Sequence, residues 1–497
     1  MKYVLAIDQG TTGSTCLVVR SDGQVVGRGY REITQHYPQP GLVEHDAEEI
    51  FERTREAARE AIAAARVVPE AIGITNQRET IVVWDRRTGA PVHRAIVWQD
   101  RRTAPRCAEL SPRAEEISRR TGLVVDPYFS ATKLEWLLRQ VPGLAARAVA
   151  GELAAGTIDA WLVWKLTGGQ VHATDPTNAS RTMLYDIDRL AWSDELCALF
   201  GVPRAMLPDV RSSSGDFGTA SAEHLGAAIP IRGVVGDQQS ALYGQGCWAK
   251  GEGKNTYGTG AFLLFNAGAS RPNGGGGLLT TIACDAKGQP AYALEAAVFI
   301  AGAAIQWLRD GLQLLAHAGE SEAMARSLVS NDGVYFVPAL VGLAAPHWDA
   351  DARGMIVGLT RGTGRAHLVR AALESMAYST ADVVDAARTF GGVAVDRLRV
   401  DGGATANDWL MQFQADVLGI PVERPSMLET TALGAAGLAG VAAGVWASPG
   451  EFLAARQFTK FTPGADRAIA TSGRDGWQRA VRATLGWARD VREGAGR

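Results

Sequence analysis

The sequence lacks an excess of charge of either sign. Its 497 residues contain 50 Lys and Arg against 53 Asp and Glu, a formal net charge of −3, and the pI is near 6.3. Proteins that bind DNA, RNA or anionic membranes through surface charge carry a strong basic excess or stripe. We therefore expect a small-molecule partner and no nucleic-acid partner.

Cysteine is also scarce. The five cysteines lie far apart, form no C-x-x-C pair and are odd in number: Cys16, Cys107, Cys197, Cys247 and Cys284. Such spacing indicates neither a disulfide framework nor a zinc site, and it fits a reducing compartment. The N-terminus, MKYVLAIDQG, reaches Asp8 before any apolar stretch long enough for a signal peptide. We therefore expect a cytoplasmic protein.

Long uncharged stretches are lacking, apart from residues 430–450, TTALGAAGLAGVAAGVWASPG. Their length matches a membrane-spanning helix. Alanine and glycine dominate where leucine and isoleucine would be needed, so transfer into lipid would gain little. Glycines spaced three or four residues apart instead permit close packing against a neighbour. We expect a buried helix and no membrane span.

Apolar residues make up 46% of the chain and charged residues 21%, which is ample for sizeable cores. The length favours two or three domains. Strand and helix patterns alternate from end to end, which predicts α/β architecture. Glycine and lysine accumulate in ALYGQGCWAKGEGKN, and we place a domain boundary there, between residues 1–247 and 248–497.

Two hairpins with small-residue turns are predicted, one in each half, over residues 3–20 and 255–265. Because they share one design, two domains could bind one polyphosphate from both sides. Other strands are predicted at 71–76, 80–85, 95–98, 231–239, 334–339, 354–359 and from 397. Helices are predicted after a capping box at Asp46 and near 132–139, 157–166, 298–310 and 365–388.

The turn DQGTTGST, residues 8–15, has no lysine and is followed by a strand, so it is neither a P-loop nor a dinucleotide fingerprint. Its parts still suit a phosphate. Its glycines let backbone amides approach an anion, Thr11 and Thr12 add hydroxyls, and Asp8 can face a hydrated Mg²⁺. A glycine-threonine turn alone is more often only a turn. The second hairpin, DGG at 401–403 and the acid of GDQQ favour the phosphate interpretation.

Arg78 and Glu79 lie side by side in ITNQRETIVVW, in the loop between two predicted strands. A solvated surface pair is one interpretation. A polyol site is another, because a carboxylate beside a guanidinium satisfies hydroxyls that both donate and accept. Trp98 and Tyr128 could add an apolar wall, although aromatic residues more often belong to a core.

Asp237 follows an apolar strand in VVGDQQSAL, where open α/β folds present groups to ligands. A carboxylate at this place could equally cap the next helix. If Asp237 faces a substrate hydroxyl, it can accept the proton as the oxygen attacks a γ-phosphoryl group.

These motifs together resemble the glycerol kinases of the FGGY family of carbohydrate kinases. The resemblance runs from residue 3 to about residue 445, in the family's order. It rests on DQGTTGST, ITNQRET, IVWQDRRT, TGLVVDPYFSATK, TDPTNASRTMLYD, GDQQSALYGQ, NTYGTGAF, AGAAIQWLRD, RVDGGATAND and ETTALGAA. It implies an actin-like ATPase fold, in which two ribonuclease H-like domains enclose a central cleft.

The resemblance also assigns roles by position. It implies that ATP phosphorylates glycerol to sn-glycerol 3-phosphate, the first step of glycerol catabolism, with Mg²⁺, in a homo-oligomer that is a dimer or tetramer. Asp237 matches the catalytic base, and Asp8 and Asp237 match the residues that face Mg²⁺. The glycerol contacts match Arg78, Glu79, Trp98, Tyr128, Asp237, Gln238 and Phe262. The ATP contacts match Thr11, Thr12, Gly13, Thr259, Gly302, Gln306, Gly403 and Asn407.

Some positions depart from the family pattern. The first hairpin commonly carries an arginine that touches the nucleotide, where this chain has Thr15. In enteric relatives a loop with Gly and Arg binds fructose 1,6-bisphosphate, but residues 221–230 contain no basic residue other than His224. We do not expect that feedback, and we interpret His224 as an ordinary surface histidine.

Two rival functions stay open at this level. Another polyol or ketose kinase of the family would keep the phosphate turns but change QRET and DPYFS. A nucleotide-gated binding protein of the actin or Hsp70 kind would need the hairpins but no polyol pocket. The combination of Arg78, Glu79 and Asp237 favours the glycerol kinase.

Overall fold

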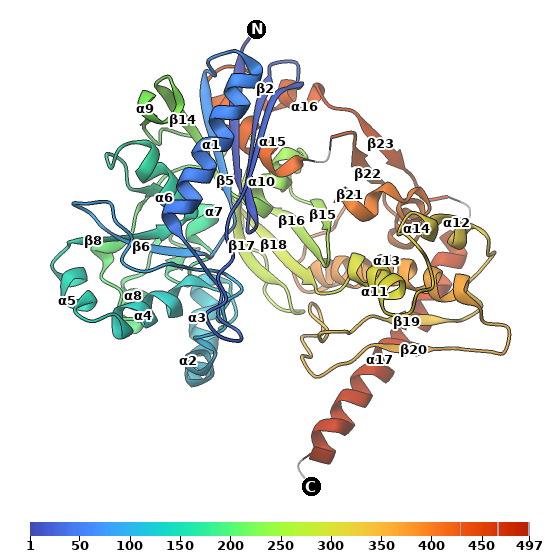
Figure 1. Ribbon diagram of the computed structural model, residues 1–497. Coiled ribbons are helices and arrows are strands. Elements are labelled where there is room, and N and C mark those ends of the chain that lie inside the picture. Colours follow the sequence, from blue (N-terminus) through green and yellow to red (C-terminus); the bar gives the residue numbers. More distant parts are fainter. Residues whose placement is uncertain (428, 465–466, 496–497) are drawn as a thin grey trace.

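The computed structural model describes residues 1–427, 429–464 and 467–495. Two large β-sheets lie side by side, one in each half of the chain, and helices cover their faces (Figure 1). A smaller four-stranded sheet lies below the first large sheet in this view. The loops next to its strands contain Arg78, Glu79 and Trp98. The alternating strand and helix pattern of the sequence predicted this architecture.

The first large sheet has six strands in the order β13-β14-β5-β1-β2-β3. The predicted N-terminal hairpin is present, because β1 and β2 pair antiparallel around the turn at residues 10–12. Strands β5 and β14 then continue the sheet parallel to β1. The strands are β1 Tyr3–Gln9, β2 Gly13–Arg20, β3 Val25–Glu32, β5 Ala71–Asn76, β13 Thr219–Ala220 and β14 Ile229–Gly236.

The second large sheet repeats this plan with seven strands in the order β17-β18-β16-β15-β21-β22-β23. Its hairpin, β15–β16, is antiparallel, and β21 and β22 follow in parallel, as β5 and β14 do in the first sheet. The strands are β15 Glu252–Tyr257, β16 Ala261–Gly268, β17 Leu279–Cys284, β18 Pro290–Val298, β21 Arg397–Gly402, β22 Val422–Pro425 and β23 Phe458–Phe461.

The smaller sheet has the order β4-β7-β6-β8, with β4 Glu44–His45, β6 Ile81–Asp85, β7 Ala95–Ile96 and β8 Leu153–Thr157. The strand predicted over 95–98 is shorter than expected. Val97 still donates to the Val43 carbonyl opposite it, whereas the Trp98 amide donates to the Thr80 hydroxyl instead of to a strand.

The remaining elements agree with the helix patterns of the sequence. Asp46 caps α1 through the amides of Glu48 and Glu49, while the Glu49 carboxylate accepts from Thr34 instead of closing the predicted capping box. The helices on the first half are α1 Ala47–Ala65, α2 Ala104–Glu109, α3 Ala114–Thr121, α4 Ser130–Gln140, α5 Leu144–Val149, α6 Ile158–Leu166, α7 Pro176–Ala179, α8 Asp194–Leu199, α9 Ala222–Leu225 and α10 Asp237–Gly244.

The helices of the second half are α11 Gly302–Asp310, α12 Glu320–Arg326, α13 Arg365–Thr389, α14 Asp408–Leu418, α15 Thr430–Ala442, α16 Pro449–Ala454 and α17 Arg467–Ala495. Short strands and turns of 3₁₀ helix complete the chain: β9 Ala173–Thr174, β10 Tyr185–Asp186, β11 Ala191–Trp192, β12 Asp209–Val210, β19 Tyr335–Val337, β20 Met355–Val357, η1 Ser111–Arg113, η2 Arg204–Met206 and η3 Gly403–Ala406.

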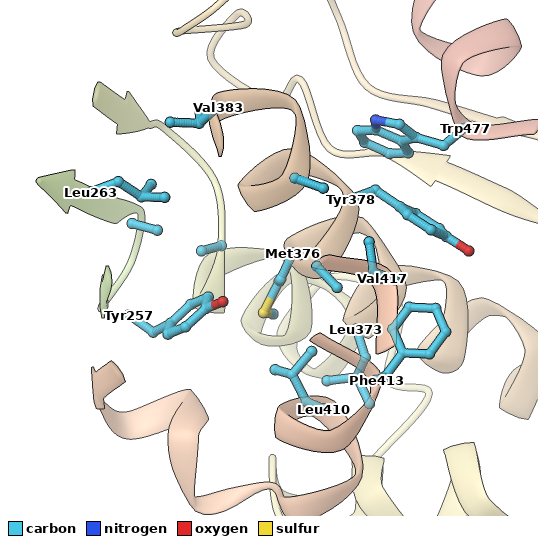
Figure 2. Close-up of a cluster of buried hydrophobic side chains, with 14 of the residues drawn as sticks. Tyr257, Leu263, Leu373, Met376, Tyr378, Val383, Leu410, Phe413, Val417 and Trp477 are labelled. Atoms are coloured by element: carbon cyan, nitrogen blue, oxygen red, sulfur yellow. The ribbon is translucent and has the colours of Figure 1, made fainter. Parts of the chain in front are cut away.

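The core of the second half forms where α13 crosses α14 (Figure 2). Met376 and Leu373 of α13 pack toward Leu410 of α14, and Tyr257 closes the cluster from the second sheet. Trp477 of α17 stacks on Tyr378 with ring centroids 5.7 Å apart. Nearer the C-terminal end of α17, Ala488 packs with Ala339 and Ala352, and Arg492 pairs with Asp349. The last turns of the helix protrude from the molecule (Figure 1).

Helix α15 comes from the second half of the chain but packs on the first sheet, against β1, β5 and β14. It is buried along most of its length, as predicted for residues 430–450. Within the described ranges, no helix has the length and apolarity to cross a membrane. Helix and sheet approach closely, because a Cβ on Gly73 of β5 would lie 2.1 Å from the Ala435 carbonyl oxygen of α15.

The crossing of α10 and α15 gives a stability prediction. A Cβ on Gly434 would lie 1.9 Å from the Ser240 carbonyl oxygen of α10, which the backbone can accommodate only by moving. We expect Gly434→Ala to lower the free energy of unfolding by about 1–3 kcal/mol, as overpacking does. Denaturant and thermal unfolding followed by circular dichroism measure the change.

Gly486→Ala is the matched control, because Gly486 also lies inside a helix, α17, and a Cβ there would meet no atom within 4 Å. It should stabilise by up to about 1 kcal/mol through helix propensity alone. Equal effects of the two substitutions would contradict tight packing at the α10–α15 crossing.

Candidate active site

The parallel strands of the first sheet bring three distant segments to one edge. Gln9 at the end of β1 is level with Asn76 of β5, and Asn76 is level with Gly236 of β14. Because parallel strands end at the same edge, Asp8, Arg78 and Asp237 are brought there together. The sequence placed Asp8 and Asp237 at strand ends and Arg78 in a loop after a strand, and only the family resemblance assigned the three to one site.

Arg78 is buried, with 2% of its side chain exposed, so the surface-pair interpretation is wrong. Its Nε lies 3.0 Å from Asp237 Oδ1, and its Nη1 and Nη2 donate to the Glu295 carboxylate at 2.7 and 3.0 Å. Nη1 also donates to Gln239 Oε1 at 3.2 Å. A guanidinium has five N–H donors, so one N–H on Nη2 has no partner among the residues that the structure describes and can take another.

Glu79 adopts a left-handed backbone conformation, with φ of 62°, which is costly for a residue with a long side chain. Its Oε1 accepts from Arg181 Nε at 2.5 Å, and its carbonyl accepts from the Ser130 hydroxyl at 2.8 Å. No described residue donates to its Oε2. Burial raises the pKa of Glu79, while Arg181 and Arg78 oppose that rise. The free oxygen is therefore an acceptor on a carboxylate whose Oε1 lies 3.9 Å from Arg78 Nε.

Asp237 is the first residue of α10, and Gly236 occupies the N-cap position. Its Oδ1 forms an ion pair with Arg78 Nε at 3.0 Å and accepts a hydrogen bond from the Gln238 amide at 2.6 Å. The side chain stays 30% exposed. The interpretation of Asp237 as a helix cap is therefore wrong, because Gly236 holds the N-cap position and has no side chain with which to cap α10. Asp237 still presents a carboxylate to the edge of the sheet, as the other interpretation required.

Trp98 and Tyr128 are half-buried, and their rings meet edge to face with centroids 5.5 Å apart. Trp98 also donates through Nε1 to the Thr11 hydroxyl at 2.9 Å. Phe262, on β16 of the second sheet, is half-buried as well. These rings are not core residues, and Trp98 joins the aromatic wall directly to the predicted phosphate turn.

The turn that contains Thr11, Thr12 and Gly13 is short and well anchored. Gln35 donates to the Thr11 carbonyl at 2.8 Å, and Thr12 is exposed. Gly13 has a packing role, because a Cβ there would lie 2.5 Å from the Arg31 carbonyl oxygen of β3. Thr15, the departure from the family pattern, is level with Asp8 in the hairpin.

All five nucleotide-side residues assigned in the second half line one cavity of about 510 Å³. They are Thr259, Gly302, Gln306, Gly403 and Asn407. Ile305, Leu373 and Met376 add an apolar wall to the same cavity. Its size and its mixture of apolar and polar walls fit a small organic ligand. Asn407 also caps α14, through the Leu410 amide at 2.9 Å.

Asp8 faces the site from the end of β1 without a cationic partner among the described residues. Burial and the negative charge of Asp237 raise its pKa to about 7. Asp8 is therefore easily protonated near neutral pH, and a cation bound beside it would favour its charged form.

Three of the site's charged residues were not predicted from the sequence. Arg181 lies in the motif NASRTML and is fully buried against the rings of Tyr128 and Phe129, with centroid distances of 5.5 and 5.2 Å. Glu295 is the one acid in the apolar strand AYALEAAV. A single acid in such a strand indicates a buried charge with a partner, so the sequence could have identified it as a candidate.

Lys254 was interpreted as part of a linker but lies inside β15. It is fully buried, and its Nζ donates to Gln238 Oε1 at 2.5 Å and to Thr256 Oγ1 at 2.9 Å. His224, by contrast, lies apart from this group, with its ring edge to face against Phe51 at 5.2 Å.

The balance of buried charge gives a prediction. Arg181→Met removes a cation from beside Glu79 and Glu295, and breaking a buried pair in this way costs about 3–5 kcal/mol. We expect a correspondingly lower unfolding temperature. Adding Glu79→Gln to that variant should recover part of the loss, because it removes the uncompensated charge. If the changes in unfolding temperature caused by Arg181→Met and by Glu79→Gln simply added in the double variant, the proposed charge balance would be contradicted.

Two domains of one known protein family match this chain. The N-terminal domain of the FGGY family of carbohydrate kinases matches residues 3–244, and the C-terminal domain of that family matches residues 253–443.

Relatives match along almost the whole chain. Glycerol kinase from Symbiobacterium thermophilum is 54% identical over 495 residues, covering 98% of this chain and 99% of the relative. Glycerol kinase 2 from Thermotoga maritima is 53% identical over 493 residues, covering 98% and 99%.

Solved structures agree. Plasmodium falciparum glycerol kinase with ADP superposes with a TM-score of 0.93 at 37% identity, covering 98% of each chain. Xylulose kinase from Lactobacillus acidophilus, at 21% identity, has a TM-score of 0.88 over 98% of this chain and 99% of that chain, which shows the shared fold. The expected actin-like ATPase fold with two domains is confirmed. The chain belongs to the FGGY family of carbohydrate kinases.

Proposed function

We propose that this chain transfers the γ-phosphoryl group of ATP to glycerol and releases sn-glycerol 3-phosphate and ADP. One observation carries the proposal: Arg78 and Glu79 keep one free donor and one free acceptor beside the Asp237 carboxylate. Two neighbouring hydroxyls need such a donor and acceptor, and the third hydroxyl of a triol then faces Asp237. The relatives named glycerol kinase, at about 54% identity over nearly the whole chain, agree with this substrate.

Glycerol binds between charged and aromatic side chains. The Arg78 Nη2 hydrogen and Glu79 Oε2 orient two hydroxyls, and Gln238 contributes its amide. Trp98, Tyr128 and Phe262 border the carbon chain. Because these groups are buried or half-buried, they exclude much of the water that would compete as a nucleophile.

Asp237 acts as the general base. Its Oδ1 is occupied by Arg78 and the Gln238 amide, so Oδ2 accepts the proton of the terminal glycerol hydroxyl. The glycerol oxygen forms a bond to the γ-phosphorus in line while the bond from phosphorus to the leaving oxygen of ADP breaks. Arg78 holds the Asp237 carboxylate in its orientation.

ATP binds between the two hairpins. Thr11, Thr12 and Gly13 face its phosphates from the first half, and Thr259 faces them from the second. Gly302, Gln306, Gly403 and Asn407 border the nucleoside part in the cavity of the second half.

Mg²⁺ fits the site at Asp8, whose carboxyl has no cationic partner among the described residues. This cation is commonly held by one or two carboxylates together with substrate phosphates and water, and Asp8 and Asp237 supply two such carboxylates. When bound there, Mg²⁺ supplies positive charge to the phosphoryl oxygens during transfer.

We retain the remaining sequence-based assignments as proposals. The chain divides into domains at residues 1–247 and 248–497, with α15 of the second packing on the sheet of the first. The five buried free cysteines fit a cytoplasmic enzyme. The expected homo-oligomer, a dimer or tetramer, stays a prediction.

The substrate assignment is tested with a panel of acceptors. In a coupled assay for ADP, we expect glycerol to stimulate ADP release far more than xylulose, ribulose or gluconate, because the free donor and acceptor match a short triol. Equal or greater stimulation by one of the sugars would overturn the glycerol assignment.

The role of Asp237 is tested by Asp237→Asn. The amide keeps an oxygen near Arg78 but cannot take the proton, so kcat should fall by about 10²–10⁴ while glycerol binding stays measurable by calorimetry. Asp186→Asn is the control, since Asp186 is buried among backbone amides away from the edge of the sheet. Wild-type turnover by Asp237→Asn would exclude Asp237 as the base.

A further inference from the structure

One row of side chains crosses the second sheet opposite the first turn of α10. Lys254 of β15 pairs with Leu264 of β16, and Leu264 pairs with Glu295 of β18. Residues directly opposite in antiparallel strands project from the same face of a sheet. The row therefore presents a cation, an apolar group and an anion to one side. Leu264 packs with Leu242 of α10, which places that helix over the row.

The cationic end of the row contacts Gln238. The fully buried Lys254 donates to Gln238 Oε1 at 2.5 Å and to Thr256 Oγ1 at 2.9 Å. An ammonium group donates and never accepts, so the amide oxygen of Gln238 must face it. The NH₂ group of Gln238 is thereby turned away from Lys254. Burial lowers the pKa of Lys254 to about 8, while Asp401 and Asp237 oppose that change.

The anionic end contacts Arg78. Glu295 accepts two hydrogen bonds from the Arg78 guanidinium, at 2.7 and 3.0 Å, in the bidentate geometry that fixes its plane. Burial alone would raise the pKa of Glu295, but Arg181 and Arg78 lower it to about 2. The guanidinium of Arg78, fixed in this way, in turn contacts Asp237 and Gln239 of α10.

We propose that Lys254 and Glu295 form a charge clamp through which the second sheet positions the glycerol-binding groups of the first half. Lys254 orients the side-chain amide of Gln238 so that the NH₂ group of Gln238 faces the substrate. Glu295 orients the guanidinium of Arg78 so that the remaining N–H of Arg78 faces the substrate. Both are positioning residues. The proposal rests on the proposed function, because Gln238 and Arg78 are glycerol contacts there.

A purely structural role would make a different prediction. Removing one partner from a buried ion pair destabilises the fold, whatever the function of the pair. Glu374 offers a matched case, since it is buried, accepts from Arg370 at 2.8 Å and lies on α13 in the core of the second half. Loss of stability is therefore expected for both glutamates. Only the clamp predicts that removing Glu295 raises the KM for glycerol while removing Glu374 does not.

The kinetic test uses Lys254→Met, Glu295→Gln and Glu374→Gln in the full-length protein. We expect the KM for glycerol to rise about tenfold in the two clamp variants, with the KM for ATP within twofold of wild type. Glu295→Asp, which keeps the charge, should recover part of the loss. Glu374→Gln should leave the KM for glycerol unchanged while lowering the unfolding temperature.

A second variant covers the case in which removal of a clamp charge prevents folding. Gln238→Glu keeps an oxygen for Lys254 but replaces the NH₂ group, so the KM for glycerol should again rise at least tenfold without loss of thermal stability. Glycerol KM values within twofold of wild type in all of these variants would overturn the clamp. An equal rise in Glu374→Gln would overturn it too.

Hydrogen–deuterium exchange separates failure of the clamp from failure of the proposed function. Amides in the first turn of α10 should exchange faster in Lys254→Met and Glu295→Gln than in wild type and Glu374→Gln, whatever the substrate. If wild type prefers another polyol, the proposed function fails, and the clamp is judged on the KM for that polyol. Unchanged exchange in α10 would overturn the clamp in either case.

Discussion

The bidentate ion pair between Arg78 and Glu295 is the interaction on which the substrate side of the site depends. It joins residues 217 positions apart, one from the end of β5 and one from β18. Buried charges are costly unless each has a partner of good geometry. Here Arg181 and Glu79 complete a group of two cations and two anions, so the guanidinium can be both buried and rigid. An apolar replacement could fill the space but could not fix the direction of the remaining N–H.

The repeated sheets explain why one site needs both halves. Each sheet places a glycine-containing hairpin turn next to the end of a parallel strand, at residues 10–12 beside β5 and at residues 258–260 beside β21. One sheet therefore supplies one phosphate turn, and two are needed to enclose a polyphosphate. Helix α15 secures the arrangement because it leaves the second half and packs on β1, β5 and β14.

Local patterns made much of this predictable. Both hairpins, the N-cap at Asp46 and the buried alanine-rich helix follow from short stretches of sequence, and so does the presence of an acid at the end of a strand. The partners of the charged residues could not be derived in this way. Arg181 meets Glu79 across 102 residues, and Lys254 meets Gln238 across a turn that the sequence presents as a linker. Only the tertiary fold decides which buried charge faces which.

Strand β15 adds a constraint that concerns both substrates. Lys254 near its start contacts Gln238 on the glycerol side, and Thr259, five residues later, lines the nucleotide cavity. A strand rises about 3.4 Å per residue, so these two points lie at most about 17 Å apart along one chain segment. Because β15 pairs on both sides, with β16 and β21, it cannot lengthen or slide without breaking a ladder. In-line transfer needs a fixed separation between acceptor and donor, and a paired central strand provides it.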